Sequence, residues 1–300
     1  MTLTPMVSGY QVTFETDPAR FLERAGAHLA DEPVISTVVA TVAERFARSQ
    51  RAATPYSWFA VVTGPAGEIV GAAMRTAPFP PYPLYVLGMP DAAAIALADA
   101  LVDRAEDVGG ANGSLPATRV LADRVAERTG GTVEINMHMR LFELGELVEA
   151  RPVPGRLRPA YDDEADLVFD WFRRFHVDAD EQAGHVGHGH RDEGFTVDDA
   201  RDRITGGCVW LWVADDDTPL HMTCANPPAF GVARIGPVYT PKEHRGHGYA
   251  SAAVGAVSRA LRDGGSRVSL FTDQANPTSN GIYLALGYEP VVDTVDLAIR

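Results

Sequence analysis

The apolar positions of this 300-residue chain follow two alternating periods, one typical of helices and one typical of strands. In the first half, helical spacing alternates with short runs rich in β-branched and aromatic residues. The pattern predicts helices at residues 18–29, 34–48, 91–105 and 116–128, and strands at residues 57–62, 68–76, 84–87 and 132–144. This half therefore mixes helices and strands.

The second half repeats that order of elements, which indicates a duplication. Its pattern predicts helices at residues 166–175, 196–204, 249–263 and 277–286 and strands at residues 209–214, 220–225, 232–239 and 267–271. One or two closing strands are predicted at residues 289–299. Two prolines and a glycine within residues 147–157 disfavour a helix and predict a connector there. We therefore expect two domains, 1–150 and 151–300, of a mixed α/β (α+β) class with largely antiparallel sheets.

Composition and charge narrow the classes of function. Hydrophobic residues make up 46% of the chain and charged residues 22%, as in ordinary globular proteins. The formal charge of -14 would repel phosphate backbones and anionic lipid, so we expect neither a nucleic-acid nor a membrane partner. No leader pattern and no apolar run of about 18 residues is present, which predicts a cytoplasmic protein. Cys208 and Cys224 have no scaffold or zinc spacing and are predicted to be reduced, buried thiols.

A glycine-bearing turn joins the predicted strand at residues 232–239 to the helix at residues 249–263. Gly246 and Gly248 allow successive N–H groups to point into one concavity at a helix N-terminus, where the helix dipole also favours an anion. Arg245 would add a positive charge at the mouth, and the small Ala250 would let the helix approach the bound group. The segment therefore predicts a pyrophosphate site, although an ordinary strand-to-helix turn uses glycine in the same way.

The motif Arg245-x-x-Gly248-x-Ala250 resembles the Arg/Gln-x-x-Gly-x-Gly/Ala signature of the GNAT superfamily of N-acetyltransferases. The resemblance continues through residues 276–283 to Gly287-Tyr288, which look like the second cofactor segment of that family. It is specific over residues 232–290 and looser back to Arg156. It implies that acetyl-CoA lies between two splayed parallel strands, here residues 232–239 and 267–271, and that no metal is needed.

The resemblance also implies roles for individual residues. The main chain of Val238 and Thr240 would bind the pantetheine amides, and the turn from Arg245 to Ser251 would hold the pyrophosphate. By this likeness the cofactor-binding residues are Val238, Tyr239, Thr240, Arg245, Gly246, His247, Gly248, Tyr249, Ala250, Ser251, Asn276, Ser279 and Asn280. Tyr283 would be the general acid that protonates the departing thiolate, since a phenol can donate a proton at neutral pH. A core aromatic is the alternative for Tyr283, and a helix N-cap is a parallel role for Asn276.

The general base is the weak point of the resemblance. Ala233, Arg234 and Ile235 supply no acid on the strand where many relatives carry a glutamate. The residues that could substitute, directly or through water, are Asp180, Glu181, His176 and Tyr239. The base could also be no residue at all.

Three further patterns are interpreted as structural. His185, His188 and His190 with Asp192 are separated by glycines, so a substrate-side loop is favoured over a metal site. Trp171, Phe172 and Phe175 follow one helical face and indicate core packing. Residues 78–83, rich in proline, could line a pocket or form a stiff surface loop.

In the first half, residues 86–91 run into the alanine-rich helix without an Arg-x-x-Gly-x-Ala turn, and Ala126 stands where Tyr283 stands in the second half. This predicts a degenerate copy that has lost the cofactor. The expected function is acetyl-CoA-dependent transfer of an acetyl group to a primary amine, a small molecule or a peptide N-terminus, by direct attack. The alternatives are a CoA-binding sensor or assembly protein without turnover and a mycothiol-synthase-like acyltransferase. The acceptor and the oligomeric state are not predicted.

Overall fold

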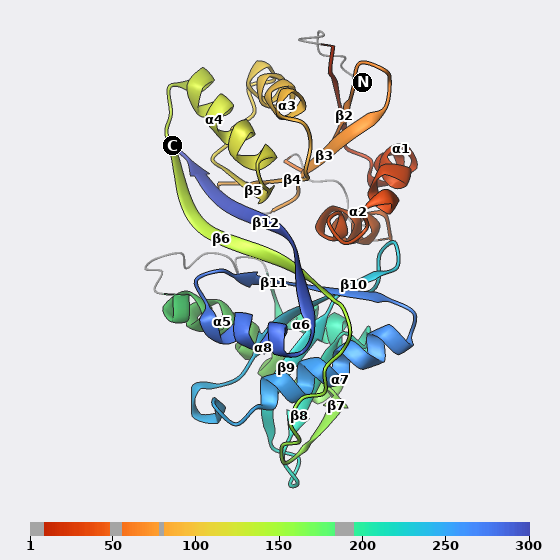
Figure 1. Cartoon of the computed structure of the whole chain (residues 1–300), viewed down its shortest axis with the longest axis vertical. Helices are drawn as coiled ribbons and strands as arrows, with labels where there is room; N and C mark the ends of the chain where they lie inside the picture. Colours follow the sequence, from red (N-terminus) through yellow and green to blue (C-terminus); the bar gives the residue numbers. More distant parts are fainter. Residues whose placement is uncertain (1–8, 49–55, 78–80, 184–194) are drawn as a thin grey trace. The chain divides into compact units, whose positions relative to one another are not determined.

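The computed structural model describes residues 9–48, 56–77, 81–183 and 195–300 (Figure 1). The chain divides into two units. Unit 1 comprises residues 1–140 and 292–300, and unit 2 comprises residues 141–291.

Within the described residues, each half of the chain contributes ten principal elements. Those of the first half are β1 (Gln11–Glu15), α1 (Pro18–Asp31), α2 (Thr37–Arg48), β2 (Trp58–Thr63), β3 (Ile69–Arg75), β4 (Leu84–Val86), α3 (Asp91–Asp103), β5 (Gly110–Ser114), α4 (Ala117–Thr129) and β6 (Val133–Leu144). Those of the second half are β7 (Arg156–Pro159), α5 (Ala165–Ala183), α6 (Val197–Thr205), β8 (Val209–Val213), β9 (Pro219–Ala225), β10 (Val232–Tyr239), α7 (Tyr249–Asp263), β11 (Arg267–Asp273), α8 (Pro277–Ala285) and β12 (Tyr288–Ile299). The two halves thus share one order of helices and strands.

Two strands of the first half were not predicted, and both complete the repeat. The residues Gly-Ala-Asn-Gly-Ser of β5 are poor strand formers, and β1 is a run of only five residues. Neighbouring strands supply what local propensity lacks, because β5 pairs with β4 on one side and with β12 on the other. Tertiary pairing therefore overrides the local sequence here.

Strand pairing is also the same in the two halves. The first four strands of each half pair antiparallel in sequence order, β1 to β4 and β7 to β10. The fourth and fifth strands then pair parallel, β4 with β5 and β10 with β11. The predicted fold class, a mixed α/β fold with helices flanking a mixed sheet, is confirmed.

The division between the units differs from the expected boundary at residue 150. Unit 2 begins at Leu141, inside strand β6, and the last nine residues return to unit 1. There the end of β12 pairs antiparallel with β5, from Thr294 opposite Ser114 to Ala298 opposite Gly110. The sequence could not show that the end of the chain belongs to unit 1. The residues of a strand do not determine which other strand it will pair with.

Helices cover unit 2 on both faces of its sheet. On one face, Trp171 and Phe172 of α5 join Met222, Cys224 and Tyr239 in a buried cluster. On the other face, Val254 and Val257 of α7 pack with residues of β10, β11 and α8. The interpretation of Trp171 and Phe172 as core residues is confirmed, and both cysteines are buried and free.

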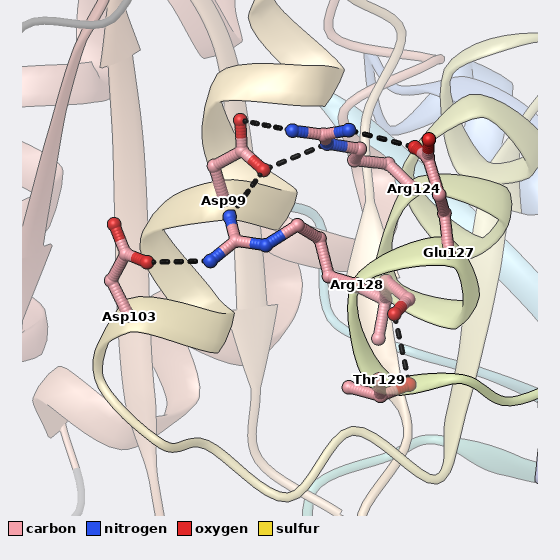
Figure 2. Close-up of polar contacts among 7 residues, drawn as sticks. Asp99, Asp103, Arg124, Glu127, Arg128 and Thr129 are labelled. Atoms are coloured by element: carbon pink, nitrogen blue, oxygen red, sulfur yellow. Dashed lines mark hydrogen bonds and ion pairs between the residues drawn. The ribbon is translucent and has the colours of Figure 1, made fainter.

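In unit 1, helices α3 and α4 lie against each other and are joined by an ionic network (Figure 2). Asp99 of α3, only 6% exposed, accepts hydrogen bonds from Arg124 and Arg128 of α4, with shortest distances of 2.8 Å to each. Asp103 pairs with the other side of Arg128 at 2.9 Å. Burial alone would raise the pKa of the Asp99 carboxyl, but the two arginines outweigh that effect and lower it.

We expect Asp99→Asn to destabilise unit 1 by about 1 kcal/mol, because one charge-assisted acceptor is lost from two partly exposed arginines. Asp103→Asn is the matched control and should cost less, since Asp103 is more exposed and holds one arginine. Denaturant unfolding of both variants at several pH values tests this. The folded pKa of Asp99 is depressed, so its contribution is present above about pH 4 and disappears as the pH falls through the folded pKa. An equal loss for both variants would contradict the network.

Candidate active site

The parallel strands β10 and β11 of unit 2 pair over only part of their length. Their register runs from Val232 opposite Arg267 to Ile235 opposite Leu270, after which both strands continue without pairing to each other. At the same point β10 carries a β-bulge, because Ile235 and Val238 lie opposite Ala225 and Thr223 of β9. A bulge bends a strand locally. The splayed parallel pair expected from the sequence is therefore present.

The turn that follows β10 leaves a continuous row of backbone N–H groups without partners. Gly246 and Gly248 both adopt left-handed backbone conformations, with φ of 79° and 84°. Gly248 is the N-cap of α7, and no side chain caps this helix. Six successive residues have N–H groups with no acceptor among the described residues: Gly246, His247, Gly248, Tyr249, Ala250 and Ser251. Such a row at a helix N-terminus is a ready anion site.

Arg245 lies beside this row, but its guanidinium is already engaged. Its Nε donates to the carbonyl oxygen of Thr240 at 3.0 Å, and its Nη2 donates to Asp178 of α5 at 2.7 Å. The sequence analysis expected Arg245 to add a charge at the mouth of the site. In the structure that charge is paired with a carboxylate, and the capacity to bind an anion resides in the backbone.

A buried histidine, which the sequence analysis did not single out, stands behind the same turn. His221 of β9 is fully buried and bonds through both ring nitrogens, Nδ1 to the hydroxyl of Thr240 at 2.7 Å and Nε2 to that of Thr223 at 2.8 Å. Burial lowers the pKa of His221 to about 3, so the ring is neutral at physiological pH. It ties β9 to the first residue after β10. No motif in the sequence marks this position.

Tyr283 of α8 lies where the two parallel strands separate. It is 7% exposed and belongs to one buried cluster with Ile235 and Leu270, the last residues that pair β10 with β11. Its hydroxyl makes no hydrogen bond to the described residues, whereas that of the neighbouring Tyr288 is bonded to Ser258 at 2.7 Å. Burial raises the pKa of Tyr283 to about 12, which keeps the phenol protonated at neutral pH.

The asparagines of the second predicted segment have structural contacts. Asn276 caps α8, and its side-chain oxygen accepts from the N–H of Ser279 at 3.0 Å. The amide of Asn280 donates to the carbonyl oxygens of Asp273, Gln274 and Asn276. The predicted N-cap is confirmed, and a contact of these residues with the cofactor stays a prediction.

The predicted candidates for a general base that the structure describes are in contact with other side chains. The hydroxyl of Tyr239 donates to Asp178, and burial followed by this bond raises the pKa of Tyr239 to about 12, too high for a base. Glu181 pairs with Lys242. His176 lies on α5 with its ring against Phe175. The side chain of Asp180 lies outside the described residues, as do His185, His188, His190, Asp192 and residues 78–80.

Unit 1 differs from unit 2 at each of the corresponding places. Strands β4 and β5 stay paired as far as Val86 opposite Gly113, where a Cβ would clash with the carbonyl of Val86. Helix α3 has Pro90 as its N-cap and the acidic Asp91 as its first residue, and both features disfavour an anion. Unlike α3 and α4, which pack closely, α7 and α8 have little contact with each other. In unit 1 the strand pair therefore stays closed along β4, and the N–H groups before α3 that have no acceptor among the described residues, those of Gly88, Met89, Asp91 and Ala92, are interrupted by Pro90.

Comparison with known families identifies the class of one segment of the chain. Residues 156–288 match the acetyltransferase (GNAT) family. The resemblance seen in the sequence is thereby confirmed for this segment, which is a GNAT domain. A comparison of the sequence with curated proteins gave no match.

Solved structures with similar folds extend over nearly the whole chain. A GCN5-related N-acetyltransferase from Sphaerobacter thermophilus is 17% identical, with a TM-score of 0.59 and coverage of 99% of this chain and 96% of its own. A tandem GNAT protein from the clavulanic acid biosynthesis pathway is 15% identical, with a TM-score of 0.54 and coverage of 96% and 98%. A GCN5-related N-acetyltransferase from Kribbella flavida is 18% identical, with a TM-score of 0.53 and coverage of 90% and 95%. These similarities concern the fold.

The described residues contain neither a metal-binding cluster nor a membrane-spanning helix. No group of three or more His, Cys, Asp or Glu side chains there is arranged to hold a metal ion. None of the helices in the described part of the chain has the length and apolarity needed to cross a bilayer.

Proposed function

We propose that the chain is an acetyl-CoA-dependent N-acetyltransferase that transfers the acetyl group to a primary amine, either of a small molecule or of a peptide N-terminus. The observation that carries the proposal is the row of six unpartnered N–H groups beside the point where β10 and β11 separate. This arrangement offers an anion site for a pyrophosphate and an open strand edge for an extended amide-bearing arm. By the family resemblance, the main chain of Val238 and the N–H of Thr240 would bind that arm, while the carbonyl oxygen of Thr240 is held by Arg245.

In the proposed reaction, the amine nitrogen attacks the thioester carbonyl carbon, so that a C–N bond forms and the C–S bond breaks. Tyr283 donates a hydrogen bond or its proton to the departing sulfur, and the attacking amine loses its own proton to water. Because the pKa of Tyr283 is raised to about 12, complete proton transfer to a thiolate of pKa about 8.5 is uphill. Tyr283 therefore acts chiefly by stabilising the thiolate as it forms.

The proposal assigns one cofactor site to each chain, in unit 2. Unit 1 would be a degenerate copy that supports the catalytic unit. The closed β4–β5 pair, the acidic first residue of α3 and the network around Asp99 support this assignment.

We expect titration calorimetry of the full chain with acetyl-CoA to give a stoichiometry of one. The control is Asp99→Asn, which changes unit 1 only and should leave stoichiometry and affinity unaltered. Two equivalent sites would contradict the assignment to unit 2.

Release of free CoA in the presence of a panel of primary amines tests the activity itself. At least one amine should accelerate the release of thiol above the rate of hydrolysis. Tight binding of acetyl-CoA without turnover on any amine would indicate a CoA-binding sensor instead.

A further inference from the structure

Helix α5 reaches the turn that holds the free N–H groups through one buried carboxylate, Asp178. This residue is 9% exposed and accepts hydrogen bonds from two side chains at a single oxygen, from Arg245 Nη2 at 2.7 Å and from the Tyr239 hydroxyl at 3.1 Å. The ammonium group of Lys242 lies 3.6 Å from its other oxygen. Three residues from both ends of the turn thus converge on Asp178.

The contacts of Arg245 explain how Asp178 affects the shape of the turn. A guanidinium has a fixed fork of donors, and here Nε is used on the carbonyl of Thr240 while Nη2 is used on Asp178. The fork therefore connects the end of β10, the start of the glycine turn and helix α5. With Arg245 held on this side, the N–H groups of residues 246–251 are left without internal acceptors.

We propose that Asp178 is a positioning residue for acetyl-CoA: it fixes Arg245 and thereby holds the glycine turn in the conformation that binds the pyrophosphate. The inference rests on the proposed function. Asp178 acts through Arg245 and does not touch the substrate.

The direction in which the affinity for acetyl-CoA changes when the charge of Asp178 is removed separates this role from a purely electrostatic one. A carboxylate near a pyrophosphate site repels the ligand, so removing its charge alone would tighten the binding of acetyl-CoA. If Asp178 positions the turn, removing its charge releases Arg245 and weakens binding. The two readings predict opposite changes for one substitution.

The experiment is the titration of acetyl-CoA into Asp178→Asn, with Asp170→Asn as the matched control. Asp170 lies on the same helix, carries the same charge and pairs with Arg174 at 2.8 Å, whereas Asp178 pairs with Arg245. We expect the Kd of Asp178→Asn to rise about tenfold, the loss of one charge-assisted contact, and that of Asp170→Asn to stay within about twofold. At saturating acetyl-CoA, turnover of Asp178→Asn should stay near that of the unaltered chain. An unchanged or lower Kd for Asp178→Asn would overturn the inference.

Arg245→Lys provides the second test and remains decisive if Asp178→Asn does not fold. Lysine keeps the charge but cannot reach Thr240 and Asp178 together, so the same rise of about tenfold is expected. The double variant should be no weaker than either single variant, because both break one linkage. Full affinity of Arg245→Lys would overturn the inference while leaving the proposed function intact. No binding by the unaltered chain would overturn both.

Discussion

Gly248→Glu should strongly weaken the binding of acetyl-CoA while leaving the fold of unit 2 in place. The new carboxylate would lie at the N-terminus of α7. There it can accept hydrogen bonds from the free N–H groups and so occupy the anion site itself. It would also repel the pyrophosphate, and two like charges about 4 Å apart at a protein surface interact by about 4 kcal/mol. We therefore expect an affinity loss of about 10²- to 10³-fold, measured by calorimetry.

Two variants separate this effect from backbone strain. Gly248→Ala introduces the same Cβ, 3.0 Å from Val153, in the same left-handed conformation but without a charge, and should cost about tenfold or less. Gly265→Glu places a glutamate in a left-handed position just beyond the other end of α7, with no neighbouring atom in the way. It should bind acetyl-CoA like the unaltered chain. Normal affinity of Gly248→Glu would show that the pyrophosphate does not lie at this helix.

Tyr283→Phe should keep affinity for acetyl-CoA and lower the rate of acetyl transfer. The ring continues to fill the cluster with Ile235 and Leu270, and only the unpartnered hydroxyl is removed. General acids contribute about 10²- to 10⁴-fold. The raised pKa of Tyr283 makes it a weak proton donor, so we expect a loss of about 10²-fold, at the lower end of that range. The measurement is single-turnover release of the thiol with a saturating amine.

Tyr288→Phe is the matched control, because it removes a hydroxyl from a neighbouring tyrosine of the same cluster. That hydroxyl bonds Ser258, so its loss should lower stability by about 1 kcal/mol and leave the rate unchanged. The two variants should therefore show opposite patterns of rate and thermal midpoint. If Tyr283→Phe reacts at the full rate but has a lower thermal midpoint, Tyr283 is a structural residue and not the general acid.

The sequence was most informative where local chemistry determines local structure. The order of the main helices and strands, the glycine turn after β10 and the N-cap at Asn276 follow from short-range patterns, and the structure confirms them. The division of the chain near its middle was predicted about ten residues late. Strand β5 was missed because its residues carry little strand preference of their own, and strand β1 was missed because it is a run of only five residues.

The partners of charged groups could not be read from the sequence. Asp178 was not among the expected site residues, and Arg245 was expected to add a positive charge at the mouth of the anion site. Asp178 is separated from Arg245 by 67 residues, so nothing local relates the two. The same holds for His221 and Thr240, which are joined across two strands.

Short-range patterns alone were enough to indicate the family and the segment that would bind the cofactor, since glycine conformations and helix starts depend on a few adjacent residues. Only the folded chain decided that unit 1 is closed where unit 2 is open, that the last nine residues complete unit 1, and that a buried carboxylate holds Arg245. These properties depend on which segments meet in space. Strand pairing and ion pairing are satisfied equally well by many partners along a chain, and packing selects among them.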